Sequence, residues 1–239
     1  MKKIIPLVAL VLIFAACKKE NSNIKSLPAT DNSSTEAVST DIDGVTGKNS
    51  IRIGTQVWKT ANLNVSRYRN GDKIPQVSDP TAWSGLTTGA WCYYNNDTAN
   101  RAIYGKLYNW YAVNDPRGLA PTGWHIPSNA EWATLSAFLG GDAVSGGQLK
   151  SIGVFEAGTG LWYQPNVNAT NSSGFTGLPG GYRYPSGSFQ YIHSYGLWWT
   201  STEYFANDAW YSYLYYWSGE KFSYTNSKQD GLSVRCVKD

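Results

Sequence analysis

Gly174-Phe-Thr-Gly-Leu-Pro-Gly-Gly-Tyr-Arg-Tyr184 opens the part of the chain that says most about its architecture. Tyr195-Gly-Leu-Trp-Trp-Thr-Ser-Thr-Glu-Tyr204 and Gly231-Leu-Ser-Val-Arg-Cys-Val237 follow it, with an aromatic run from Asp208 to Trp217 between them. Aromatic residues favour strands, and glycine-containing turns separate these segments. The pattern predicts several short strands that pair as an antiparallel sheet.

The run from Asp208 to Trp217 would place its side chains alternately on two faces of a strand. One face carries Trp210, Ser212, Leu214 and Tyr216, and the other carries Tyr211, Tyr213, Tyr215 and Trp217. An apolar stripe of this kind is either a binding surface or a face buried in the core. The candidate ligand-binding residues are therefore Tyr211, Tyr213, Tyr215 and Trp217, together with His193, which the sequence places in a loop.

Upstream of Gly174 the pattern is helical. Asn129 to Leu139 is predicted as a helix, because Ser128 and Glu131 have the spacing of a capping box and Gly140-Gly141 ends the segment. Shorter helices are predicted within Lys106 to Val113 and Ala143 to Lys150.

A hairpin is predicted at the start of the domain, with strands at 50–53 and 57–59, and the segment 68–90 is predicted to be mostly loop. Helices that precede an antiparallel sheet indicate an α+β fold.

The first sixteen residues have the features of a bacterial signal peptide. Lys2 and Lys3 precede an apolar run that is too short to span a bilayer and ends at Ala15-Ala16-Cys17. This predicts cleavage before Cys17 and lipidation of its side chain. Residues 17–40 are polar and predict a disordered tether, which leaves 41–239 as the folded domain.

The 239-residue chain has 20 Lys and Arg against 17 Asp and Glu. Five of the bases, Lys2, Lys3, Lys18, Lys19 and Lys25, precede residue 41, so the domain itself is nearly neutral. Nucleic-acid binding is not expected, because phosphate contacts need a basic surface.

Cys92 and Cys236 are the two cysteines that remain after Cys17. An exported domain meets an oxidising compartment, so an even pair predicts a disulfide. The alternative is two buried thiols that are not bonded to each other.

Several blocks, in order, resemble the Fibrobacter succinogenes major paralogous domain family. They are Ile53-Gly-Thr-Gln-Val-Trp58, Trp91-Cys-Tyr-Tyr-Asn-Asn-Asp97, Tyr104-Gly-Lys-Leu-Tyr-Asn-Trp-Tyr-Ala-Val113, Pro121-Thr-Gly-Trp-His-Ile-Pro127 with Glu131-Trp132, and the three carboxyl-terminal stretches. Ala120 stands where many members of the family have a cysteine, which leaves Cys92 as the partner for Cys236 that the resemblance implies.

The family is in turn similar to the formylglycine-generating-enzyme branch of the C-type-lectin-like fold, on the strength of Trp124 to Trp132 and the ending Gly231 to Cys236. The resemblance implies short helices packed on a twisted antiparallel sheet. Oxidase chemistry of that branch needs a pair of reactive cysteines, and only one cysteine lies near this end of the chain.

No catalytic set emerges from the sequence. His125 has the setting of a structural histidine, and Glu203 is a single carboxylate, whereas glycoside hydrolysis normally needs a pair. No cofactor or metal is expected, although scattered oxygen ligands leave calcium open.

Three functions stay open. The first is a lipid-anchored binding or adhesion module for a glycan or protein, in the bacterial envelope and by expectation on the outer membrane, facing the periplasm or the outside. The second is a divergent oxidoreductase of the formylglycine-generating type. The third is a structural or assembly lipoprotein.

Overall fold

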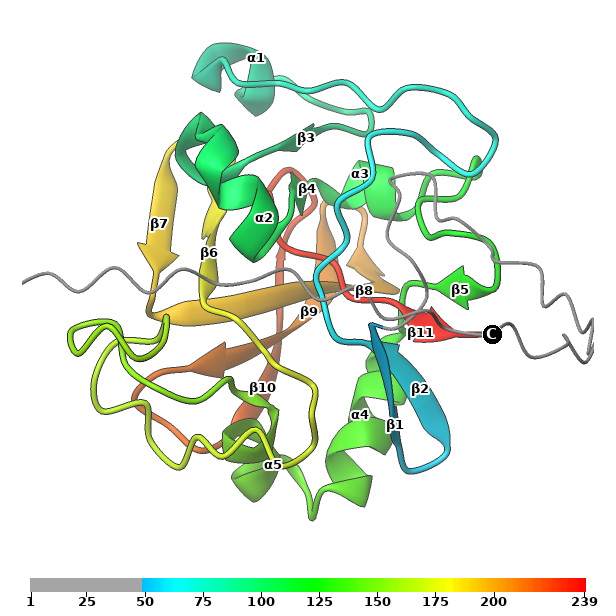
Figure 1. Ribbon diagram of the computed structural model, residues 1–239. Helices are drawn as coiled ribbons and strands as arrows, with labels where there is room; N and C mark the ends of the chain where they lie inside the picture. The colour runs from blue at the N-terminus through cyan, green and yellow to red at the C-terminus, as the bar shows by residue number, and fades with distance from the viewer. Residues whose placement is uncertain (1–48) are drawn as a thin grey trace, which may run out of the picture. The chain divides into compact units, whose positions relative to one another are not determined.

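The computed structural model describes residues 49–239, so the signal peptide, the lipidated Cys17 and the tether predicted from the sequence lie outside the described residues. The described chain is α+β, as predicted, with short helices and four sets of paired strands (Figure 1). Neighbouring strands in every sheet are antiparallel.

The helices are short. The α-helices are α1 (Pro80–Ser84), α2 (Arg101–Tyr104), α3 (Trp110–Val113), α4 (Asn129–Phe138) and α5 (Asp142–Leu149), and the 3-10 helices are η1 (Tyr94–Asn96) and η2 (Thr98–Asn100).

The strands are β1 (Ser50–Ile53), β2 (Gln56–Lys59), β3 (Trp91–Cys92), β4 (Leu107–Tyr108), β5 (Trp124–His125), β6 (Gly180–Arg183), β7 (Phe189–Ile192), β8 (Tyr195–Phe205), β9 (Asp208–Tyr215), β10 (Lys221–Ser227) and β11 (Val237–Lys238).

The first and last strands of the described chain share one sheet. Its order is β1-β2-β11-β5, and Val237 on β11 pairs with Trp58 on one side and His125 on the other. The predicted hairpin at residues 50–59 is confirmed, with Gly54 at φ 61° in the turn, a conformation that glycine adopts without steric cost. Figure 1 shows this sheet on the opposite side of the domain from β6 and β7.

The aromatic run forms the centre of the second sheet, whose order is β10-β9-β8. Tyr211 on β9 faces Trp199 on β8 and Tyr224 on β10. Beside this sheet, β6 and β7 form a separate antiparallel pair. The predicted strand at 208–217 is thus confirmed, although it ends at Tyr215.

The capping box predicted at the start of α4 is present. Ser128 Oγ accepts from the Glu131 backbone N–H, and the Glu131 carboxylate accepts from the Ser128 backbone N–H. The face of α4 that carries Trp132 and Leu135 is fully buried. The helix predicted at 143–150 is also present, as α5. Its Gly146 lies against a backbone carbonyl, since a Cβ there would be 2.1 Å from the Glu220 oxygen.

Upstream of α4, one prediction was wrong, and another was confirmed with a short helix inside the predicted loop. The helix predicted within Lys106 to Val113 is a strand, β4, followed by the single-turn helix α3, because Leu107 and Tyr108 pair with β3 and Asn109 caps the turn. The predicted loop at 68–90 contains the short helix α1, which Asp79 caps and Pro80 begins.

The final stretch also differs from the regular strand that the sequence suggests. Leu232, Val234 and Cys236 do lie together in one hydrophobic cluster, but only Val237 and Lys238 belong to a strand. Arg235, between Val234 and Cys236, is fully buried. Its guanidinium donates to Asn62 Oδ1 and to the carbonyls of Lys59 and Phe175.

The predicted disulfide between Cys92 and Cys236 is absent from the described residues. Both side chains are buried, but they pack in different hydrophobic clusters, Cys92 with Trp83 and Leu107, and Cys236 with Leu232 and Val234. Both thiols are therefore buried and not bonded to each other, which is the alternative that the sequence left open.

Candidate functional site

A pocket of about 230 Å³ is lined almost entirely by tyrosines. This tyrosine pocket is lined by Tyr182, Tyr184, Tyr191, Tyr195, Leu197, Tyr211 and Tyr213. They come from four strands, β6, β7, β8 and β9, and from the residue just after β6. The volume is below that of sites for drug-sized ligands, so the pocket suits one small ring or head group.

An irregularity in the β6–β7 pair shapes one wall of the pocket. Gly180 faces Ile192 and Tyr182 faces Gln190, while Gly181 and Tyr191 between them both have positive φ, 59° and 65°. A positive φ is rare for a bulky residue and marks a position that the surrounding structure enforces. A Cβ on Gly181 would lie 2.4 Å from the Gln190 oxygen, so only glycine fits there.

The six tyrosine rings form an unbroken series of contacts around the pocket. Ring centroids are 4.6 Å apart for Tyr184 and Tyr182, and 5.8 Å for Tyr182 and Tyr191. The series continues from Tyr191 to Tyr195 at 5.2 Å, from Tyr195 to Tyr213 at 5.9 Å, and from Tyr213 to Tyr211 at 5.7 Å. Such contacts fix ring orientations and limit the entropy that ligand binding would cost.

Burial favours the protonated form of four of these phenols. It raises the pKa of Tyr182, and a hydrogen bond with the Tyr184 hydroxyl raises it further. The pKa values of Tyr195, Tyr211 and Tyr213 are also raised, in each case mainly by burial. The pocket therefore presents neutral hydroxyls, which can both donate and accept hydrogen bonds.

One carboxyl group adjoins the pocket without lining it. Asp230 is only 1% exposed, and neither carboxyl oxygen has a hydrogen-bond partner among residues 49–239. Its charge acts on the phenols of Tyr182 and Tyr211, raising the pKa of both. Burial, with a smaller contribution from the neighbouring Asp208, raises the pKa of Asp230 itself to about 8.

The structure brings together only some of the residues singled out from the sequence. Tyr211 and Tyr213 line the pocket, half-buried. Tyr215 instead stacks on Tyr195, with ring centroids 4.5 Å apart. Trp217 lies beyond the end of β9, is 61% exposed, and contacts Tyr216.

His193 also lies outside the lining of the pocket. Its ring stacks on Phe155 at 3.9 Å, and its Nδ1 is 2.7 Å from the Leu161 carbonyl oxygen. Its partners are therefore structural ones.

Sequence reasoning missed five of the lining residues, Tyr182, Tyr184, Tyr191, Tyr195 and Leu197. The signal was the alternation Tyr182-Arg183-Tyr184, which places two tyrosines on one side of β6 and the buried Arg183 on the other. Tyr191 gave no such signal, because its orientation depends on the irregular pairing with Gly181.

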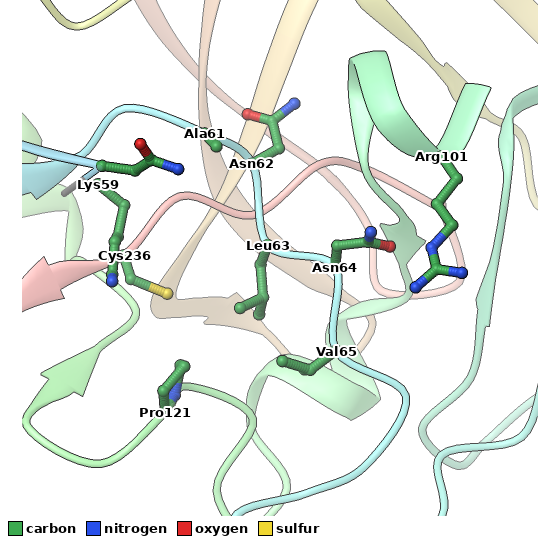
Figure 2. A pocket seen from close by; sticks show the side chains of 10 residues that line it. Lys59, Ala61, Asn62, Leu63, Asn64, Val65, Arg101, Pro121 and Cys236 are labelled. Atoms are coloured by element: carbon green, nitrogen blue, oxygen red, sulfur yellow. The ribbon is translucent and has the colours of Figure 1, made fainter. Parts of the chain in front are cut away.

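A second hollow, of about 200 Å³, lies where β2 leads into the following loop (Figure 2). Leu63, Val65, Pro121 and Cys236 supply its apolar walls, and Lys59 and Arg101 also line it. Asn49, the first described residue, is part of the lining, so the surroundings of this hollow are only partly described. The tyrosine pocket is enclosed by described residues and is the better candidate.

A separate polar cluster lies at the start of α4. His125 lies between two carboxylates, with Nε2 2.7 Å from Glu131 and Nδ1 2.8 Å from Asp239. Partial burial opposes the charge on His125, but these two hydrogen bonds outweigh it and raise the pKa.

Residues 49–239 contain no cluster of three or more His, Cys, Asp or Glu side chains that could hold a metal ion. Over the same range, none of the helices has both the length and the apolar character to cross a membrane.

Comparison with known proteins gives one match. Residues 51–238 match the family model described as the Fibrobacter succinogenes major domain. No curated protein and no solved structure matches the chain.

Proposed function

The chain belongs to the Fibrobacter succinogenes major domain family, and from that premise we propose that it is a lipid-anchored binding module of the bacterial envelope. The tyrosine pocket is its ligand site, and the ligand is a glycan. The module performs no catalysis of its own.

The tyrosine pocket is the observation that carries this proposal. Sugars have apolar faces that stack on aromatic rings and hydroxyls that need hydrogen-bond partners. Tyrosine supplies both, and the six rings form a continuous series of contacts. An aromatic site of this size accommodates a single sugar unit, such as the end of a chain.

The thiols argue against the oxidoreductase alternative. Burial raises the pKa of Cys92 to about 12, so its reactive thiolate form is scarce at neutral pH. Cys92 and Cys236 also pack in different clusters, whereas the oxidase reaction needs two reactive cysteines side by side.

The finer parts of the proposal are the fold type and the anchor. We assign the domain to the C-type-lectin-like fold, supported by its short helices packed against antiparallel strands and by the resemblance of Trp124 to Trp132. The anchor is lipidated Cys17, supported by the apolar run that ends on that cysteine.

Replacing Tyr213 by alanine tests the site. Tyr213→Ala removes a ring that touches Tyr195 and Tyr211, so it should weaken glycan binding by about 10-fold or more. The matched control is Trp217→Ala, which removes a larger and more exposed ring from outside the pocket and should leave affinity unchanged. A glycan array followed by calorimetry measures both.

Equal loss in the two variants would place the ligand elsewhere on the surface. Unchanged affinity in Tyr213→Ala would remove the tyrosine pocket from consideration. Thermal unfolding of each variant separates loss of binding from loss of structure.

A further inference from the structure

The tyrosine pocket has no charged residue in its lining, and so no Lys or Arg that could pair with an anion. The nearest basic residues along the chain interact with groups outside the pocket lining. Arg183 donates to three backbone carbonyls, Lys228 pairs with Glu203, and Lys221 pairs with Asp142.

One acidic group, by contrast, lies beside the pocket. Gly231 pairs with Arg183, which places the neighbouring Asp230 next to the stretch that carries Tyr182 and Tyr184, and the charge of Asp230 raises the pKa of Tyr182 and Tyr211. Asp230 is unusual, because a buried carboxyl with no hydrogen-bond partner among the described residues is costly to fold around. Such a group calls for an explanation beyond stability, and a positively charged ligand next to it would supply one.

We propose that the tyrosine pocket binds an organic ammonium group, with Asp230 as its counter-ion. Electron-rich tyrosine faces attract cations, and several rings around one cation form an aromatic cage. The phenol oxygens accept hydrogen bonds from a primary ammonium. The inference rests on the proposed function, because it names the chemistry of the ligand in the same pocket.

Anionic ligands fit this pocket poorly, because they would lie near Asp230 without a basic side chain in the lining to offset its charge. Two kinds of molecule carry the required group. One is an amino sugar, which would satisfy the proposed glycan function directly, and the other is a quaternary ammonium head group.

Two pairs of small molecules that differ in charge test the proposal. Glucosamine is compared with glucose, and choline with its uncharged isostere 3,3-dimethylbutan-1-ol. Binding is measured at pH 7 by calorimetry and ring-proton NMR, on full-length protein in phosphatidylglycerol nanodiscs, which contain neither choline nor sugar. We expect the charged member of at least one pair to bind on the order of 10-fold tighter than its neutral partner.

Asp230→Asn should abolish that preference, and Tyr213→Ala should weaken both members of the pair. Glu203→Gln is the matched control, because it removes a carboxylate that pairs with Lys228 outside the pocket. It should leave the preference intact.

A pH series on the unmodified protein tests the same idea without a mutation. The groups that face Asp230 are Asp208 and Tyr211 on β9 and Tyr182 on β6. A bound cation favours the ionised carboxyl, so choline, whose charge is fixed, should bind several-fold tighter at pH 9 than at pH 6. The neutral isostere should show no such change.

The outcomes separate the two proposals. A preference for glucosamine identifies an amino sugar, and a preference for choline alone supports the ammonium site while removing the glycan function. Binding of glucose and glucosamine with equal affinity, and of choline and its isostere with equal affinity, overturns the ammonium inference and leaves the glycan site standing. No binding by any of the four compounds overturns both.

Discussion

At the scale of single residues, Asp230 is a buried carboxyl group in an unfavourable environment. It has no hydrogen-bond partner among the described residues, and its pKa is raised from 3.8 to about 8, chiefly by burial. The folded protein therefore keeps a proton that the unfolded chain gives up near pH 4. It follows that the free energy of unfolding contributed by this group falls as pH rises from about 4 to about 8.

Asp230→Asn should remove this pH dependence. The variant should gain stability relative to the unmodified protein as pH rises from 5 to 8, by a few kcal/mol at most, since each pKa unit corresponds to about 1.4 kcal/mol. Urea unfolding at the two pH values measures the difference, with Glu203→Gln as the control for loss of a carboxylate. A difference between variant and parent that is the same at both pH values would contradict this account.

Among the secondary-structure elements, the β6–β7 pair has the strictest backbone requirement. Gly181 has both a positive φ and a carbonyl oxygen 2.4 Å from the position of a Cβ. Gly71 makes an informative comparison, because its φ is also positive, at 94°, but nothing lies within 4 Å of its Cβ position. The two glycines separate the cost of backbone conformation from that of steric overlap.

Gly181→Ala should cost about 2 to 4 kcal/mol of folding free energy, and Gly71→Ala about 1 kcal/mol, because only the first adds overlap to an unfavourable φ. Ligand binding should also be lost in Gly181→Ala, since Tyr191 and Tyr182 depend on that pair for their ring contact. Thermal melts and binding assays of both variants give the result. Equal losses of stability would mean that the overlap relaxes.

The sequence predicts an element well when the interactions that form it lie between residues close together in the chain. The hairpin at 50–59 and helix α4 were predictable, because a glycine turn and a capping box are short-range signals. Residues 106–113 were mispredicted, because β4 owes its state to pairing with β3, more than ten residues away. Helix α1 was missed although its cap, Asp79 before Pro80, was readable.

The tyrosine pocket was half predictable for the same reason. Tyr211 and Tyr213 follow from alternation along one strand, but nothing in the sequence shows that Tyr182 and Tyr191 meet them. Equally, alternation could not show that Tyr215 would be covered by Tyr195. Alternation defines a face, and only tertiary pairing defines what that face touches.

At the scale of the whole molecule, Arg235 connects segments that are distant in sequence. Its guanidinium reaches Asn62, the Lys59 carbonyl and the Phe175 carbonyl, and lies 4.3 Å from the Phe175 ring. Asn62 in turn accepts from Trp198. The end of the chain is thereby hydrogen-bonded, directly or through Asn62, to the residues that follow β2, to Phe175 and to Trp198 on β8.

Arg235→Met should therefore destabilise the whole domain. The substitution leaves buried acceptors without donors, and each such group costs about 1 to 3 kcal/mol of folding free energy. The free energy of unfolding should therefore fall by at least about 3 kcal/mol. Arg52→Met is the control, because Arg52 is exposed on β1 and should change stability by less than about 0.5 kcal/mol. Urea unfolding compares them, and a loss below about 1 kcal/mol in Arg235→Met would show that other donors replace the guanidinium.

The proposed anchor is tested on the whole chain. Cys17→Ser should abolish incorporation of labelled palmitate and move the protein from the membrane fraction to the soluble fraction, because attached acyl chains are the proposed link to the bilayer. Cys92→Ser is the matched control and should change neither readout. Retention of the label in Cys17→Ser would contradict the proposal that Cys17 carries the lipid.

The pairing of β1 and β2 with β11 has a mechanical consequence. The described chain enters at the β1–β2 hairpin, on the opposite side of the domain from β6 and β7, which hold part of the pocket (Figure 1). A pull between the residue 49 end and a bound ligand would thus load the domain from both ends. Trp58 on β2 pairs with Val237 on β11, so the same tension would act on the pairing of the hairpin with β11 and on the pocket. A ligand held under load would therefore test the β2–β11 pairing as well as the ligand site.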